Sequence, residues 1–193
     1  MTRKICCLGD SITWTATTRS IHPYPHYLEQ LLGPGYIVGN QAVSGYTITQ
    51  IQSLYTSYVA GEDYDDIILL GGINDLRVGT GDLTVYTTWK AIVDAVLAEG
   101  KRLIGFNVLQ MNDYAGGWTQ EKEDNRTLFN AAVAGYLTGL ANCTFIDAAS
   151  EFADAGDASV MKAAYNAGDD LHPNQAGTYR LAELARDAIL ATG

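Results

Sequence analysis

The sequence predicts an α/β fold: a flavodoxin-like three-layer sandwich in which a parallel sheet of about five strands carries helices on both faces. Two observations predict it. Short runs of continuously apolar residues, typical of strands buried on both faces, alternate with longer segments whose apolar residues recur at helical spacing. Several of the short runs end at a glycine, where the chain is expected to turn out of the sheet.

Five apolar runs are the expected strands, and they cover residues 5–8, 36–38, 67–70, 103–109 and 144–146. The expected helices cover residues 24–32, 47–59, 83–97, 128–140 and 173–189. In the second of these helices, five apolar residues are expected on one side: Ile48, Ile51, Leu54, Tyr55 and Tyr58. Ligands of such folds bind beyond the carboxyl ends of the strands, so the residues that follow each strand carry the functional information.

The composition is that of a globular protein, with 47% hydrophobic and 18% charged residues, and 193 residues suit a single domain spanning 1–193. Asp and Glu outnumber Lys and Arg by 22 to 12, so the formal net charge is −10 at pH 7. Binding to nucleic acid or to an anionic membrane depends on clustered cations. Neither is therefore expected as a partner, and the oligomeric state is left open.

The three cysteines, Cys6, Cys7 and Cys143, form no Cys-x-x-Cys pair and are expected to be buried thiols in a reducing compartment. The first residues contain no apolar signal-peptide core, and no apolar stretch approaches the roughly 20 residues of a membrane helix. The chain as given is expected to be cytoplasmic, or secreted if a signal was removed from it.

Four polar segments stand where ligands would bind. Gly-Asp-Ser-Ile-Thr follows the first expected strand at 9–13, and Gly-Asn-Gln-Ala-Val-Ser-Gly follows the second at 39–45. Gly-Gly-Ile-Asn-Asp follows the third at 71–75, and Asp-Asp-Leu-His precedes the last helix at 169–172. The fold is expected to gather the first three segments at one edge of the sheet.

These segments supply the groups that acyl transfer needs. A serine becomes a nucleophile when a base lies within hydrogen-bond reach, and Ser11 and His172 have the required chemistry. An Asp three residues before the histidine can hold its other ring nitrogen. The N–H groups of Ser11 and Gly45 and the side-chain amide of Asn74 are suited to stabilise an oxyanion.

In these four segments the chain resembles the SGNH hydrolases, also called GDSL esterases and lipases. The resemblance runs in order from Gly9 to the final helix, and it implies a triad of Ser11, His172 and Asp169. It implies an oxyanion hole of Ser11, Gly45 and Asn74. The family spacing selects Asp169 over its neighbour Asp170.

The expected activity is serine-dependent hydrolysis of short-chain carboxylic esters, with acetyl as the expected acyl group. The expected partner is a small-molecule ester, and carbohydrates are among the candidate alcohols. A thioesterase or lysophospholipase of the same family is the alternative, although the negative charge of the chain disfavours anionic substrates. A flavodoxin-like flavin-binding module is the alternative from another class. No cofactor is expected. Three aromatic residues are candidates for the substrate pocket: Trp14, Tyr114 and Trp118.

Two histidines have the spacing of metal ligands on one helix face, since His22 and His26 are four residues apart. Neither a carboxylate nor a third histidine accompanies them. No metal site is therefore expected.

Overall fold

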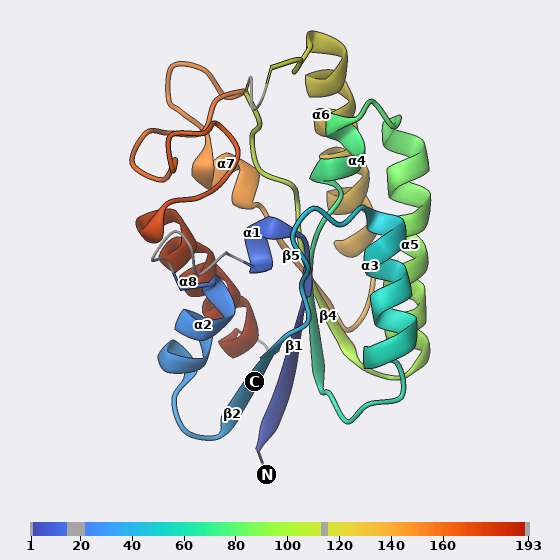
Figure 1. Ribbon diagram of the computed structural model, residues 1–193. Helices are drawn as coiled ribbons and strands as arrows, with labels where there is room; N and C mark the ends of the chain where they lie inside the picture. Colours follow the sequence, from blue (N-terminus) through green and yellow to red (C-terminus); the bar gives the residue numbers. More distant parts are fainter. Residues whose placement is uncertain (1, 15–21, 113–115, 192–193) are drawn as a thin grey trace.

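A five-stranded parallel sheet forms the centre of the molecule (Figure 1). The computed structural model describes residues 2–14, 22–112 and 116–191. The strands lie in the order β2-β1-β3-β4-β5, and neighbouring strands are parallel. They are β1 (Arg3–Gly9), β2 (Tyr36–Asn40), β3 (Asp66–Leu70), β4 (Arg102–Phe106) and β5 (Cys143–Ile146). This is the strand order of flavodoxin-like doubly wound sheets, so the predicted fold class is confirmed.

Helices cover both faces of the sheet (Figure 1). On one face α2 (Tyr24–Leu32) packs against α8 (Gln175–Leu190). On the other face lie α3 (Ile48–Leu54), α5 (Asp82–Ala98) and α6 (Gln120–Leu137), with α5 in contact with both of its neighbours. In the described parts of the chain, no helix is both long enough and apolar enough to cross a membrane.

Three short helices follow strands at the carboxyl edge: α1 (Ser11–Trp14), α4 (Ile73–Arg77) and α7 (Ala148–Phe152). None of them is among the helices expected from the sequence. Four or five residues barely complete one helical turn, so an apolar period cannot be recognised in them.

The core lies on both sides of the central strand. All five residues of β3 are buried, and the four that follow Asp66 are the continuously apolar run that predicts this. Trp89 of α5 and Phe129 of α6 are fully buried against one face of the sheet, with their rings edge to face at 6.4 Å. Close packing of this kind holds the helices at fixed positions over the strands.

The fourth strand is shorter than predicted, because it ends at Phe106 and not at residue 109. Asn107 N–H still bonds to Ile146 O at 3.3 Å, and its side chain bonds to the α7 segment. Its Oδ1 accepts the N–H of Ala149 at 2.9 Å, and its Nδ2 donates to Asp147 Oδ1 at 2.8 Å. The residues after Phe106 are buried, and they contact α7 on the way to α6 instead of extending the sheet.

The prediction for residues 47–59 is wrong at its end. After α3 the chain forms a π-helical turn, η2 (Tyr55–Val59), in which the N–H of Ala60 bonds to the carbonyl of Tyr55 at 2.8 Å. The wider turn adds a residue, so the position that faces the core moves from Tyr58 to Val59. Val59 is fully buried, and Tyr58 is 66% exposed.

Candidate active site

Ser11 stands at the carboxyl end of β1, as the first residue of α1. The turn requires glycine at position 9, because a Cβ there would lie 2.3 Å from Thr13 Oγ1 and 2.4 Å from the carbonyl oxygen of Leu70. Asp10 closes the turn, with its Oδ1 accepting the N–H of Ile12 at 3.0 Å. These local contacts determine where the Ser11 hydroxyl lies.

The structure brings Ser11, His172 and Asp169 into one chain of hydrogen-bonding groups. Ser11 Oγ lies 2.9 Å from His172 Nε2, and His172 Nδ1 lies 2.8 Å from Asp169 Oδ2. The other carboxylate oxygen, Oδ1, accepts the backbone N–H of His172 at 2.8 Å. With the Nδ1 proton directed at the carboxylate, Nε2 is left to accept the hydroxyl proton of Ser11.

The loop before α8 holds this pair in place. Asn174 is the N-cap of α8, and its Nδ2 reaches back to the carbonyls of Ala164 at 3.0 Å and Asn166 at 3.1 Å. Asp170 adopts a left-handed backbone with φ of 60°, and its side chain accepts a hydrogen bond from Asn166 at 2.9 Å. Of the two neighbouring aspartates, Asp169 is therefore the one whose side chain bonds to His172.

Asn74 and Gly45 come from the segments on either side of β1. Asn74 is buried, and its Nδ2 donates to the carbonyl of Tyr46 at 3.0 Å, which joins the turn after β3 to the residue after Gly45. The chain before Gly45 is tied to the end of β1, since Val43 N–H bonds to Gly9 O at 3.2 Å. The parallel register thus brings both segments to the edge from which Ser11 emerges.

Gly45 requires glycine for its backbone rather than for space. Its φ is 81°, which an L side chain rarely adopts, and a Cβ built there would meet no atom within 4 Å. Gly45 is exposed. Its N–H and the side-chain amide of Asn74 are the donors that the sequence predicts for an oxyanion.

Asp10 is fully buried beneath the candidate nucleophile. Burial raises its pKa to about 7, an effect that the nearby Asp75 carboxylate increases and the Ile12 N–H partly offsets. Burial likewise raises the pKa of Asp75, whose Oδ2 accepts the N–H of Ile48 at 2.8 Å. The contacts of both carboxylates are with backbone N–H groups, which is the chemistry of loop support.

The three aromatic residues expected at the substrate pocket do not share one environment in the structure. Trp14 ends α1 and is 42% exposed. Trp118 precedes α6 and packs against the hydrophobic core, with its indole N–H buried. Tyr114 lies outside the residues that the structure describes. Their assignment to the pocket remains a prediction.

The histidine pair stacks ring on ring, with 4.4 Å between the centroids of His22 and His26. Within residues 2–14, 22–112 and 116–191, no three His, Cys, Asp or Glu side chains group as metal ligands would.

The chemistry that the candidate active site offers is that of a hydroxyl, an imidazole and a carboxylate in series, beside amide donors. Such a set can carry out acyl transfer.

Sequence reasoning missed two sets of residues at this edge of the sheet. Tyr46 and Tyr58 line a small cavity, the cavity beyond Gly45, which starts at Tyr46 and extends along α3 and η2. Gln110 and Arg126 line a larger one beyond β4 and β5. A signal existed for the second set, because Asn107 is a polar residue inside the run expected to be an apolar strand and Gln110 directly follows that run.

Three solved structures illustrate what this chain is similar to. A GDSL-like lipase from Bacteroides thetaiotaomicron superposes with a TM-score of 0.79 at 16% identity, over 99% of this chain and 89% of that one. An acetyl xylan esterase gives 0.75 at 15% identity, over 96% and 99%. The aryl esterase of M. smegmatis gives 0.71 at 18% identity, over 97% and 100%. At these identities the similarity shows a shared fold.

The family follows from the sequence itself. No curated protein matches the chain. The sequence profile of the GDSL-like lipase/acylhydrolase family matches residues 7–180, which includes all four polar segments and most of the chain. The chain therefore belongs to the GDSL-like lipase/acylhydrolase family, the SGNH hydrolases, whose members hydrolyse carboxylic esters.

Proposed function

We propose that the protein is a serine-dependent hydrolase of short-chain carboxylic esters, acetyl esters first, and that the alcohol it releases is a carbohydrate. The observation that carries the proposal is the series of contacts from Ser11 Oγ through His172 to Asp169, at 2.9 and 2.8 Å. Both distances are those of good hydrogen bonds, and the order of groups is the one that turns a serine into a nucleophile.

In the proposed mechanism His172 Nε2 takes the proton of Ser11 as Oγ attacks the ester carbonyl. The tetrahedral oxyanion is held by the N–H groups of Ser11 and Gly45 and by Asn74 Nδ2. Asp169 stabilises the imidazolium that forms. The C–O bond to the alcohol breaks and His172 returns the proton to the leaving oxygen. Water then repeats the two steps on the acyl-serine, which releases the acid.

The cavity beyond Gly45 supports a sugar as the leaving group. It has a volume of about 160 Å³ and is lined by Tyr46, Gln50, Ser53, Leu54, Ser57 and Tyr58. Aromatic rings beside amide and hydroxyl groups suit the apolar face and the hydroxyls of one sugar ring. A long acyl chain would instead require a longer apolar groove. The name of one structural relative, an acetyl xylan esterase, adds support.

Hydrolysis of 4-nitrophenyl esters from acetyl to palmitoyl tests the reaction and the acyl length together. We expect turnover to fall with chain length and to be lost in Ser11→Ala. Turnover that rises toward long chains would instead favour the lysophospholipase or thioesterase alternative. Covalent labelling by a fluorophosphonate in the wild type but not in Ser11→Ala identifies the nucleophile. A yellow, flavin-containing preparation that is not labelled would overturn the proposal.

A further inference from the structure

A second cavity, of about 390 Å³, lies between α6, α7 and the segments that follow β4 and β5. None of the five residues proposed for catalysis lines it. The lining residues used below are Asn107, Gln110, Arg126, Phe145, Asp147 and Ser159. The cavity thus stands at the carboxyl edge of the sheet, where doubly wound folds bind ligands, but on the side of the edge strand β5.

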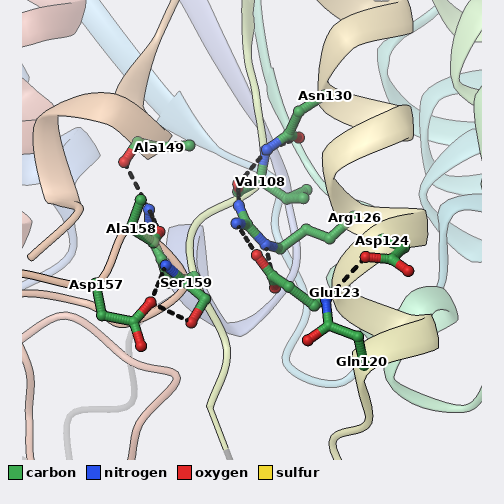
Figure 2. Close-up of polar contacts among 11 residues, drawn as sticks. Val108, Gln120, Glu123, Asp124, Arg126, Asn130, Ala149, Asp157, Ala158 and Ser159 are labelled. Atoms are coloured by element: carbon green, nitrogen blue, oxygen red, sulfur yellow. Dashed lines mark hydrogen bonds and ion pairs between the residues drawn. The ribbon is translucent and has the colours of Figure 1, made fainter.

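One wall belongs to α6 and is rigidly built (Figure 2). Arg126 is 5% exposed, and its Nε and Nη2 hold both carboxylate oxygens of Glu123, at 2.9 and 2.5 Å. Asn130, one turn later, pairs with the backbone of Val108: its Oδ1 accepts the N–H and its Nδ2 donates to the carbonyl, each at 2.9 Å. These side chains are fixed by protein partners before any ligand arrives.

The opposite wall contains a buried acceptor that lacks a donor. Gln110 is 2% exposed, and its Nε2 donates to the carbonyls of Ala149 at 2.7 Å and Ala158 at 3.2 Å. Those two bonds determine the orientation of the amide. Its Oε1 is therefore turned away from them, buried, and without a hydrogen-bond partner among the described residues. Buried acceptors are almost always paired, so this oxygen is an unusual feature of the wall, lying behind the cavity surface.

The charge of the cavity excludes anions. Glu123 and Arg126 neutralise one another, and Asp147 is left as the surplus charge. Burial alone would raise the pKa of Asp147, but hydrogen bonds from Ser150 and Asn107 outweigh it and lower the pKa. Asp147 is consequently an anion at neutral pH. A phosphate or carboxylate ligand would meet repulsion here from the cavity and from the whole chain.

The remaining surface is a mixture of hydroxyls and small apolar groups. Ser150 and Ser159 face the cavity, and its apolar part is the ring of Phe145 together with alanines, among them Ala131 and Ala134 of α6. The alanines create the room. An aromatic ring beside fixed amides and hydroxyls is complementary to a ligand with an apolar face and a rim of hydroxyl groups.

We infer that this cavity is a second binding site, for a neutral polyhydroxylated ring of the size of one monosaccharide. Ligand hydroxyls meet Asp147 and Ser159, and the ring lies on Phe145. The inference does not depend on the proposed reaction, because no catalytic group is shared.

Isothermal titration with D-xylose, D-glucose and D-galactose tests it. Two variants fill the cavity from α6 without removing a hydrogen bond, Ala134→Leu at a half-buried position and Ala131→Leu at an exposed one. The matched control is Ala91→Leu, an exposed alanine of α5 outside the cavity. We expect one equivalent of at least one sugar to bind the wild type and the control. Both filled variants should bind it at least tenfold more weakly.

Equal affinity in all four proteins would place the bound sugar elsewhere and overturn the inference, as would a wild type that binds none of the three sugars. Thermal unfolding of each variant checks that it is folded, and Ala131→Leu remains informative if Ala134→Leu is not. Turnover of 4-nitrophenyl acetate by the wild type, measured on the same sample, separates the two proposals. If the protein hydrolyses the ester but binds no sugar, only this inference is refuted. If it binds sugar but does not hydrolyse the ester, only the proposed hydrolase function is refuted.

Discussion

Asp75 Oδ2 accepts the N–H of Ile48 at 2.8 Å, and this one bond joins the helix after β3 to the first residue of α3. One residue earlier, Asn74 makes a parallel link to Tyr46 O at 3.0 Å. The two bonds together link the segments of Asn74 and Gly45, the two residues proposed as oxyanion donors outside the nucleophile turn. The proposed oxyanion hole is therefore supported by a carboxylate that has no proposed role in the chemistry.

Two substitutions of Asp75 are expected to show whether its hydrogen bond to Ile48 supports the site. Asp75→Ala leaves the buried Ile48 N–H without an acceptor, which costs about 1–3 kcal/mol of unfolding free energy. It should also lower kcat for 4-nitrophenyl acetate while the protein remains folded. Asp75→Asn keeps an oxygen for the bond and is the matched control. Denaturant unfolding and steady-state kinetics measure both effects, and equal behaviour of the two variants would contradict the role given to this contact.

The two adjacent aspartates should differ sharply in their effect on turnover. Because Asp169 Oδ1 accepts the His172 N–H, Asp169→Asn places an NH2 donor opposite His172 Nδ1 and favours the wrong tautomer, and we expect kcat to fall by roughly 10⁴. Asp170→Asn should change kcat only a few-fold, because asparagine tolerates the left-handed backbone at this position, where φ is 60°. Steady-state kinetics of the two variants on one short-chain ester decide which aspartate supports His172. A larger loss for Asp170→Asn would show that the triad assignment is wrong.

Stability should depend on pH through Asp10. The folded protein holds the Asp10 proton up to about pH 7, because burial raises that pKa, whereas the unfolded chain releases it near 3.8. The folded state therefore binds more protons between these values, and the unfolding free energy falls as pH rises through them. Asp10→Asn has no proton to lose.

We expect the stability difference between Asp10→Asn and the wild type to move in favour of the variant by about 2 to 3 kcal/mol from pH 5 to pH 8. Urea unfolding of both proteins across this range measures it. Comparing slopes cancels any pH-independent cost of the buried amide. Parallel stability curves would mean that Asp10 is ionised throughout.

The cavity beyond Gly45 predicts a substrate-dependent effect of Tyr58. This residue is 66% exposed, so Tyr58→Ala should leave the fold and the turnover of 4-nitrophenyl acetate nearly unchanged. For an acetylated xylo-oligosaccharide we expect KM to rise about tenfold, the order of magnitude of a lost ring-stacking contact. Tyr58→Phe retains the ring and should restore KM. An equal effect of Tyr58→Ala on both substrates would argue against a sugar subsite.

The fold class and the edge of the sheet that carries the candidate site can be inferred from the sequence alone. Alternation of buried runs with helical periods predicts the parallel sheet, because strands buried on both faces are largely apolar, as residues 67–70 of β3 are. Order along the chain also suffices to place Ser11, Gly45 and Asn74 at one edge, since the carboxyl ends of parallel strands meet there. These inferences rest on local patterns and on topology.

Only the tertiary structure decided which side chains meet. A π-helical turn moved Tyr58 from the core side to the surface, because one added residue rotates the register and no local pattern marks that addition. Asn107 ended β4 early because its partners, Asp147 and Ala149, lie forty residues further along the chain. The same long-range packing left Gln110 Oε1 buried beside a cavity. Contacts between distant residues arise from the folded chain as a whole, so a sequence read in windows cannot contain them.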